Sequence, residues 1–224
     1  MINDSMFSGI KACIFDMDGT LIDSLDIWTE IDNCFFARRG LKKPDDYEMR
    51  IAHMNFMEMA VMTHDTYGIK ESPEEIANEW VQESIQAYQT TIPAKSGAKE
   101  FLDCLRQRGI HLSLATSNRR ELYEPCLTRL GMFSYFDCCL NVNDLHSTKA
   151  EPKIYLSLAE KMNARPEESI VFEDILLALK TAKTAGFKTC AVYDHHSYKD
   201  EAEIIRISDQ YIQSYPEALL EIGR

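Results

Sequence analysis

Two pairs of acidic residues stand where apolar segments of the chain end. Asp16 and Asp18 follow one apolar run, and Gly19 allows the chain to turn directly afterwards. Side chains two residues apart on an extended chain point the same way, so both carboxylates can face one cleft. Glu173 and Asp174 follow another apolar run. An acidic turn alone is often only a solvated surface feature, so each pair by itself is a candidate for chemistry and no more.

A hydroxyl-rich turn and a lysine lie between these two pairs. Thr116, Ser117 and Asn118 end a third apolar run. Small hydroxyls, an amide and the N–H groups of a following helix are natural partners of phosphate oxygens, although a plain helix cap would have the same composition. Lys149 stands just before a predicted helix, where most lysines are solvated. These residues could form a binding site only if the four segments converge in the folded protein.

Electrostatics indicates what such a convergence would require. Two carboxylates about 4 Å apart repel by roughly 4 kcal/mol at an effective dielectric near 20. Asp16, Asp18, Glu173 and Asp174 would form several such pairs. Mg²⁺ takes oxygen ligands, offsets the repulsion and keeps water ligands that a phosphate can share. With Lys149 as a second positive charge, the group would suit a phosphoryl ligand.

The surrounding elements can position these residues at one edge of a sheet. We predict strands over residues 10–15, 110–115, 169–172 and 188–193. Amphipathic segments between them predict helices over residues 97–108, 119–130, 153–162 and 176–185. Strands that alternate with helices of this length indicate an α/β fold, in which a parallel sheet is flanked by helices. The carboxyl ends of such strands are where ligands bind.

One segment breaks the alternation. Apolar residues between 27 and 35 recur at helical spacing, and a methionine-rich stretch follows over residues 49–62. Ser72 begins a good signature for a further helix. We therefore predict an all-helical cap domain at residues 22–91, inserted into an α/β core domain of residues 1–21 and 92–224. The methionines are expected to form the core of the insertion rather than a ligand surface.

Composition limits the partners. The net charge of −12 argues against nucleic acid, whose phosphates would be repelled, but it leaves a small phosphorylated metabolite open. Seven cysteines without regular spacing indicate a reduced protein, expected in the cytoplasm. The sequence has neither a signal-peptide pattern nor an apolar run of transmembrane length, so we expect no membrane association. A monomer is expected, because the cap belongs to the same chain.

Taken together, the four segments resemble the motifs of the haloacid dehalogenase-like (HAD) hydrolase superfamily, in the family order and over nearly the whole chain. The insertion after the first motif looks like the C1-type cap of that family, and the rest like its Rossmann-like core. Many relatives have proline after the motif lysine, where this sequence has Ala150. The matching segments are Asp16-Met17-Asp18-Gly19-Thr20, Ala115-Thr116-Ser117-Asn118, Lys149 ahead of Pro152-Lys153-Ile154-Tyr155, and Val171-Phe172-Glu173-Asp174.

This resemblance implies a magnesium-dependent phosphatase that acts on a small phosphorylated metabolite. Asp16 would attack phosphorus and form an aspartyl-phosphate, and Asp18 would be the general acid and base. Thr116 would hydrogen-bond the phosphoryl group, with help from the backbone of Ser117 and Asn118.

The resemblance also implies how charge is balanced. Lys149 would neutralise the nucleophile and the phosphate, because positioning and electrostatics dominate phosphoryl transfer. Mg²⁺ would be held by Asp16, Asp174, the backbone carbonyl of Asp18 and, through water, Glu173.

Three other functions are compatible with a fold of this kind, and the sequence argues against each. The dehalogenase branch of the family has a non-acidic residue at the position of Asp18, so dehalogenation is disfavoured. A sugar phosphomutase resembling beta-phosphoglucomutase would have a histidine in the cap, where this chain has Trp28. A non-catalytic metal-binding scaffold would be expected to have lost Asp16 or Asp18, and both are present.

Cap residues are expected to select the substrate, because a closing lid contacts the leaving group. His195 and His196 are adjacent on a predicted loop, which is a poor chelating geometry, so we expect them to be surface residues. Residues of these types pack in cores or lie at surfaces more often than they bind ligands. The candidates for substrate contact in the cap are Trp28, Arg50, His53, Asn55 and His64.

Overall fold

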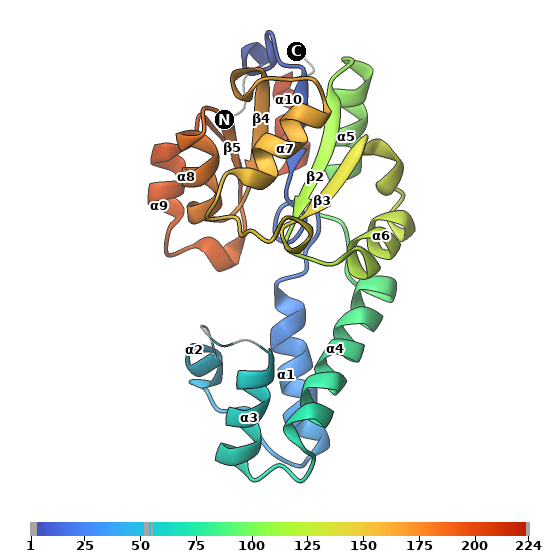
Figure 1. The fold of residues 1–224 in the computed structure, drawn as a ribbon, viewed down its shortest axis with the longest axis vertical. Coiled ribbons are helices and arrows are strands. Elements are labelled where there is room, and N and C mark those ends of the chain that lie inside the picture. The colour runs from blue at the N-terminus through green and yellow to red at the C-terminus, as the bar shows by residue number, and fades with distance from the viewer. Residues whose placement is uncertain (1–3, 52–53, 55, 223–224) are drawn as a thin grey trace. The chain divides into compact units, whose positions relative to one another are not determined.

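The computed structural model describes residues 4–51, 54 and 56–222. The chain divides into two compact units, Met1–Asp23 with Pro93–Arg224, and Ser24–Ile92. We call the first the core unit and the second the helical unit (Figure 1). Whether the helical unit acts as an active-site cap stays a prediction.

A parallel sheet forms the centre of the core unit. Its strand order is β3-β2-β1-β4-β5-β6, and every neighbouring pair is parallel. This arrangement confirms the predicted Rossmann-like α/β fold, because parallel strands must be linked by crossovers that put helices on the sheet faces. The strands are β1 (Ala12–Phe15), β2 (His111–Thr116), β3 (Cys138–Asn141), β4 (Ser169–Glu173), β5 (Lys188–Val192) and β6 (Gln210–Ile212).

The two strands at the sheet edges were missed by the sequence reasoning. β3 has four residues and β6 has three, and neither is a long apolar run. Edge strands are covered less completely than central ones, so their sequences lack the continuous hydrophobicity of β1 or β4. The four predicted strands are all present.

Helices cover both faces of the sheet. On one face, the rings of Phe15 and Phe172 stack with their centroids 4.3 Å apart, and Phe101 and Tyr215 join them from two helices. The opposite face packs Ile14 and Val171 against a third helix, α7, which lies across the sheet in Figure 1. The helices are α5 (Ala98–Gln107), α6 (Arg120–Arg129), α7 (Lys153–Lys161), α8 (Leu176–Thr184), α9 (Glu201–Ile207) and α10 (Tyr215–Ile222), with 3-10 turns at Asp4–Phe7, Phe133–Tyr135, Asn143–Leu145, Pro166–Glu168 and His195–Ser197.

The helical unit has its own hydrophobic core. Phe35, Phe36, Tyr47 and Trp80 lie at its centre with ring centroids 5.0–5.6 Å apart along the chain of contacts. The last helix begins with a capping box at Ser72, as its sequence predicted. In the described part of this unit the elements are helices: α1 (Asp26–Arg38), α2 (Tyr47–Ile51), α3 (Phe56–Tyr67) and α4 (Pro73–Thr90).

The methionine-rich stretch only partly fills this core. Met59 and Met62 pack against it, as expected. Met49, Met54 and Met57 are 76%, 36% and 43% exposed, so for them the prediction of a core role is wrong. The spacing of the methionines in the sequence could not distinguish buried from exposed positions, because methionine is tolerated both in cores and at adaptable surfaces.

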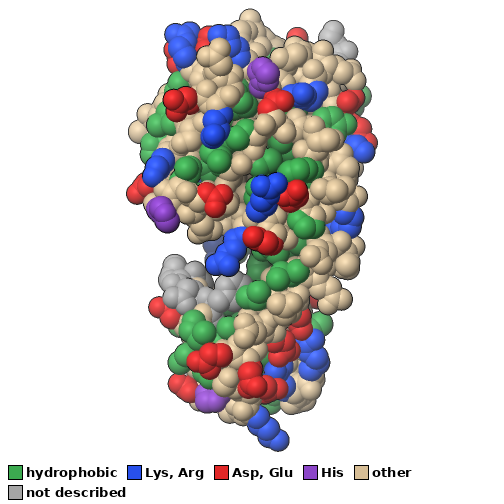
Figure 2. All heavy atoms as spheres, turned by 45° about the vertical axis from the view of Figure 1, so that its right-hand side comes forward, with side chains coloured by type: hydrophobic (Ala, Val, Ile, Leu, Met, Phe, Trp, Pro, Cys, Tyr) green, Lys and Arg blue, Asp and Glu red, His purple; other side chains and the backbone are tan. Residues whose placement is uncertain are grey.

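Charge is mixed on the molecular surface. Over the coloured part of the face in Figure 2, Lys and Arg side chains are interspersed with Asp and Glu side chains. Among the described residues, no helix has the length and apolar character needed to cross a membrane.

Candidate active site

The acidic residues meet at the carboxyl edge of the two central strands. β1 and β4 are neighbours, with Phe15 opposite Phe172, so the residues after them lie side by side. The N–H of Asp16 donates to the carbonyl of Phe172 at 3.0 Å. Asp16, Glu173 and Asp174 each offer a carboxylate oxygen, and these atoms lie within 4.8 Å of one another. All three residues are at most 4% exposed. The convergence expected from the strand ends is therefore present for Asp16, Glu173 and Asp174.

Lys149 supplies the positive charge of this group. Its Nζ donates to Asp16 Oδ1 and to Glu173 Oε1, the latter at 2.5 Å, and its side chain is 12% exposed. The neighbouring Lys153 instead donates to the backbone carbonyl of Leu145 at 2.6 Å. The structure thus brings Lys149 to the site without a following proline.

Both oxygens of Glu173 are occupied by donors. Oε1 accepts from Lys149 and, at 3.4 Å, from the hydroxyl of Tyr155. Oε2 accepts from the N–H groups of Asp174 and Ile175 at 3.1 and 3.2 Å. Glu173 is therefore engaged in holding the lysine and the loop. Tyr155 belongs to the third motif, but the sequence predicted no role for it. The contact depends on the burial of Tyr155 in the same cluster as Val171 of β4.

Asp174 has one satisfied oxygen and one unsatisfied oxygen. The hydroxyl of Thr20 donates to Oδ1 at 3.0 Å. Oδ2 is buried and has no hydrogen-bond partner among the described residues. A buried carboxylate oxygen without a partner is unfavourable, whereas a hard cation with oxygen ligands would satisfy it. The donor set and this unsatisfied atom fit Mg²⁺.

The pKa values report a shortage of positive charge in the group. Burial, with Glu173 and Asp18 nearby, raises the pKa of Asp16 to about 8 although Lys149 opposes the shift. Burial and the neighbouring Glu173 and Asp16 raise the pKa of Asp174 well above its usual range. For Lys149, burial acts to lower the pKa, but the carboxylates outweigh it and raise the pKa well above the usual value. One ammonium group does not balance three buried carboxylates.

The second motif contacts Asp18 through Asn118. Asn118 Nδ2 donates to Asp18 Oδ2 at 2.6 Å. Thr116 is fully buried, and its hydroxyl accepts from the N–H of Asn118 at 3.0 Å. Ser117 is exposed. The side chain of Asn118 therefore contacts Asp18, which the sequence did not predict, because its amide was expected to be a partner of phosphate oxygens.

The candidate residues of the helical unit are engaged locally. Trp28 packs against the hydrophobic core of the unit. Arg50 pairs with Asp46 at 2.7 Å, and His64 Nδ1 lies 2.8 Å from Asp65 Oδ1. His53 and Asn55 lie outside the described residues.

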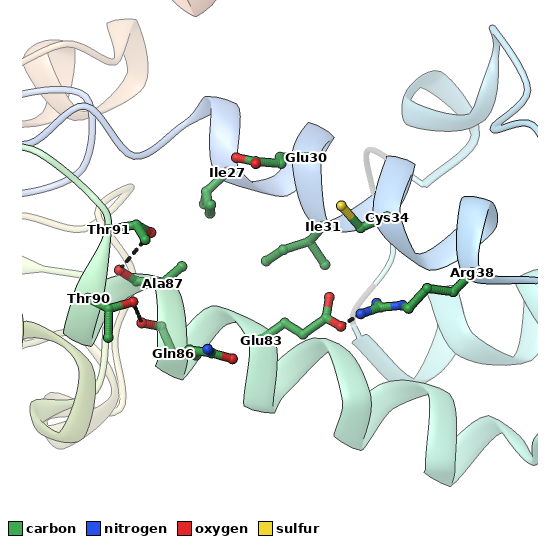
Figure 3. A pocket seen from close by; sticks show the side chains of 10 residues that line it. All are labelled: Ile27, Glu30, Ile31, Cys34, Arg38, Glu83, Gln86, Ala87, Thr90 and Thr91. Atoms are coloured by element: carbon green, nitrogen blue, oxygen red, sulfur yellow. Dashed lines mark hydrogen bonds and ion pairs between the residues drawn. The ribbon is translucent and has the colours of Figure 1, made fainter.

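A groove of about 400 Å³ lies between α1 and α4 of the same unit (Figure 3). An ion pair between Arg38 and Glu83 closes one end, and neither Trp28, Arg50 nor His64 lines it. Its mixed lining does not define a ligand class. The lining residues are Ile27, Glu30, Ile31, Cys34, Arg38, Glu83, Gln86, Ala87, Thr90 and Thr91.

His195 and His196 are exposed, as predicted. The ring of His196 has Nδ1 3.1 Å from Asp194 Oδ1, and the two rings are 4.0 Å apart.

The profile of the haloacid dehalogenase-like hydrolase family matches residues 13–192, a range that contains all four motifs. The chain belongs to this family. It is therefore a HAD hydrolase, as its motifs indicated.

Several relatives of this HAD hydrolase are named phosphatases. The chain is 31% identical over 180 residues to a phosphorylated carbohydrates phosphatase of Thermotoga maritima, covering 80% of this chain and 83% of the relative. It is 26% identical over 194 residues to hexitol phosphatase B of Escherichia coli K12, covering 82% and 83%.

The fold is also similar to that of a Thermotoga maritima protein described provisionally as a beta-phosphoglucomutase. The TM-score is 0.81 at 25% identity, covering 95% of this chain and 100% of that structure. The likeness therefore extends over both units.

Proposed function

We propose that this HAD hydrolase is a magnesium-dependent phosphatase that hydrolyses a phosphate monoester of a sugar or polyol through an aspartyl-phosphate. The observation that carries the proposal is the buried carboxylate of Asp16 beside Lys149 and the unsatisfied Oδ2 of Asp174, at the carboxyl edge of β1 and β4. The names of the two relatives support the substrate class.

In the first step, a carboxylate oxygen of Asp16 attacks phosphorus and the ester P–O bond breaks. The leaving alkoxide takes a proton from Asp18, so the products are the free alcohol and a phosphorylated Asp16. Asn118 holds the Asp18 carboxyl group through its hydrogen bond, which restricts the acid to one orientation. Lys149 stabilises the negative charge that gathers around the nucleophile.

In the second step, Asp18 accepts a proton from water and the resulting hydroxide attacks the phosphoryl group. The bond between phosphorus and Asp16 breaks, which restores the carboxylate and releases inorganic phosphate. Thr116 is the last residue of β2, next to β1, and Ser117 and Asn118 follow it. Hydroxyl and N–H groups of this turn can bind phosphoryl oxygens.

Asp16 and Asp174, with the backbone carbonyl of Asp18, would hold Mg²⁺. When bound, this ion neutralises charge on the phosphoryl oxygens and on the buried carboxylates. Glu173 would contribute through a water molecule, which agrees with the four donors that already occupy its oxygens.

The Asp16→Asn variant tests the nucleophile. We expect wild-type protein to release p-nitrophenol from p-nitrophenyl phosphate only with Mg²⁺, and the variant to lose this activity by at least about 10³-fold, because an amide is a poor nucleophile. Asp103→Asn on α5 is the matched control and should retain wild-type rates. An active Asp16→Asn variant would refute the nucleophile assignment. An inactive wild-type protein would instead favour the non-catalytic metal-binding scaffold.

The phosphomutase alternative is favoured by the fold of the Thermotoga maritima protein. At the position where that branch is expected to have a cap histidine, Trp28 packs against the core of the helical unit, and its indole, unlike an imidazole, does not titrate between pH 5 and 8. Incubation with beta-glucose 1-phosphate and a bisphosphate primer separates the two functions. Free phosphate supports hydrolysis, and glucose 6-phosphate supports the mutase.

We further propose that residues 22–91 act as the cap and that the enzyme is a cytoplasmic monomer. The seven cysteines, all within the described residues, are free thiols, which supports a reducing compartment.

A further inference from the structure

A hydrogen-bonded chain links the C-terminal helix of the core unit to the carboxylate group. The hydroxyl of Tyr215, the first residue of α10, donates to the backbone carbonyl of Thr20 at 3.0 Å. The hydroxyl of Thr20 in turn donates to Asp174 Oδ1 at 3.0 Å. Thr20 is fully buried and Tyr215 is 1% exposed, so neither bond is replaced easily by water.

This chain determines which oxygen of Asp174 remains available. Because Thr20 occupies Oδ1, the carboxylate keeps one orientation and Oδ2 is left without a partner among the described residues. A carboxylate whose second oxygen is tied in this way is pre-organised as a ligand, since less rotamer freedom is lost when a cation binds.

Tyr215 is itself held firmly. Its ring packs on that of Phe101, with centroids 5.1 Å apart. The next residue, Pro216, lies so close to Gly97 at the start of α5 that an added Cβ there would be 2.9 Å from it. Burial raises the pKa of Tyr215 well above its usual value, so the hydroxyl stays protonated and can only donate to the carbonyl.

We infer that Tyr215 and Thr20 are positioning residues for a cation at Asp174, and that α10 acts on the metal site through them. The inference rests on the proposed magnesium-dependent function. Tyr215 lies outside all four motifs and 195 residues from Thr20 in the sequence, yet it would set the affinity of the site for Mg²⁺.

The test measures the Kd for Mg²⁺ independently of enzymatic activity, from the rise of the thermal unfolding midpoint with Mg²⁺ concentration. Tyr215→Phe removes only the hydroxyl and should raise the Kd for Mg²⁺ about 2- to 12-fold, the range expected for one buried hydrogen bond. Thr20→Val should raise it about 10- to 100-fold, as for other partners of metal ligands. Thr20→Ser keeps the hydroxyl and should stay within about 3-fold of wild type.

A double variant and a control separate positioning from simple stability. If Tyr215 acts through Thr20, then Tyr215→Phe should add little in the Thr20→Val background. Tyr47→Phe is the matched control: it removes a buried hydroxyl that bonds Thr63 at 2.8 Å in the helical unit, and should lower the midpoint without changing the Kd.

Several results would overturn the inference. A wild-type Kd in Tyr215→Phe, or additive effects in the double variant, would exclude the role of Tyr215 while the proposed function stands. If Tyr215→Phe does not fold, the two Thr20 variants decide instead. Equal Kd values for Thr20→Val and Thr20→Ser would show that the Thr20 hydroxyl does not affect Mg²⁺ binding, which would also exclude a role for Tyr215 acting through it. A wild-type chain that binds no Mg²⁺ would overturn both the inference and the proposed function.

Discussion

Asp16 and Glu173 share one ammonium group, and this sharing sets the charge of the site. Lys149 Nζ lies 2.5 Å from Glu173 Oε1 and also donates to Asp16. Without the lysine, two buried carboxylates would face each other with no fixed counter-charge, an arrangement that is strongly unfavourable. The lysine therefore balances charge in the folded protein, and the catalytic role proposed for it rests on the same contacts.

The Lys149→Met variant tests this role at constant side-chain bulk. With Mg²⁺ saturating and folding verified by circular dichroism, we expect kcat for p-nitrophenyl phosphate to fall about 10²- to 10³-fold, as when a single stabilising group is removed from a transition state. Lys153→Met is the matched control, because Lys153 lies in the same segment and its Nζ donates to the backbone carbonyl of Leu145. A larger loss in Lys153→Met would reverse the assignment of the motif lysine.

At the scale of single elements, helix α1 carries a buried acid. Asp32 is 5% exposed, and burial together with Glu48 raises its pKa to about 7, although Lys43 opposes the shift. The ordinary pKa of aspartate is about 3.9. Because the folded state holds the proton more tightly than the unfolded chain, the stabilising effect of protonation is complete below about pH 4. It is lost as the pH rises toward and through 7.

Asp32→Asn should therefore stabilise the protein at high pH. We expect the variant to exceed wild type by about 1–3 kcal/mol in urea unfolding at pH 8, and the difference to shrink toward zero near pH 4.5. Asp45→Asn, at an aspartate whose side chain is 93% exposed, should leave the pH profile unchanged. A constant difference at all pH values would show that titration of Asp32 is not the cause.

The contact between α5 and α10 allows a second test at this scale. Gly97 and Gly109 have nearly equal positive φ angles of 77° and 75°. An added Cβ at Gly97 would meet Pro216, whereas at Gly109 nothing lies within 4 Å among the described residues. Gly109→Ala should lower the free energy of unfolding by about 1 kcal/mol through backbone strain alone.

Gly97→Ala should lower it by about 1–3 kcal/mol more, because Pro216 must move. Chemical denaturation of both variants measures the difference. Equal losses would mean that α10 moves freely, and would weaken the case that it holds Tyr215 firmly.

At the scale of the whole molecule, the carboxylate group belongs to one of two compact units. All three of its acids and Lys149 lie in the core unit. A ligand that binds only the native state suppresses local unfolding of the region that holds it. Hydrogen exchange measures local unfolding separately in each unit.

Mg²⁺ should therefore protect the two units unequally from hydrogen exchange. We expect slower exchange at the carboxyl ends of β1 and β4 in saturating Mg²⁺, and little change in α3 or α4 of the helical unit. Mass spectrometry of the peptides measures this, with EDTA-treated protein as the control. Equal protection throughout would contradict a site confined to the core unit.

Much of this protein follows from local patterns in its sequence. Asp16 and Glu173 follow long buried runs, and parallel strands place such ends at one edge, so their convergence was predictable. The spacing of apolar residues shows which face of a strand or helix is buried. It therefore predicted the four inner strands, the helices between them and the all-helical segment.

Only the tertiary structure decided the remaining features, because they depend on contacts between distant segments. The edge strands β3 and β6 are only partly buried, so their sequences lack the buried apolar run that marks β1 and β4. Tyr215 reaches Thr20 across 195 residues, and no local pattern marks that contact. Residue types and their order determined the chemistry that this chain can perform, whereas packing decided which oxygen of Asp174 is left for a cation.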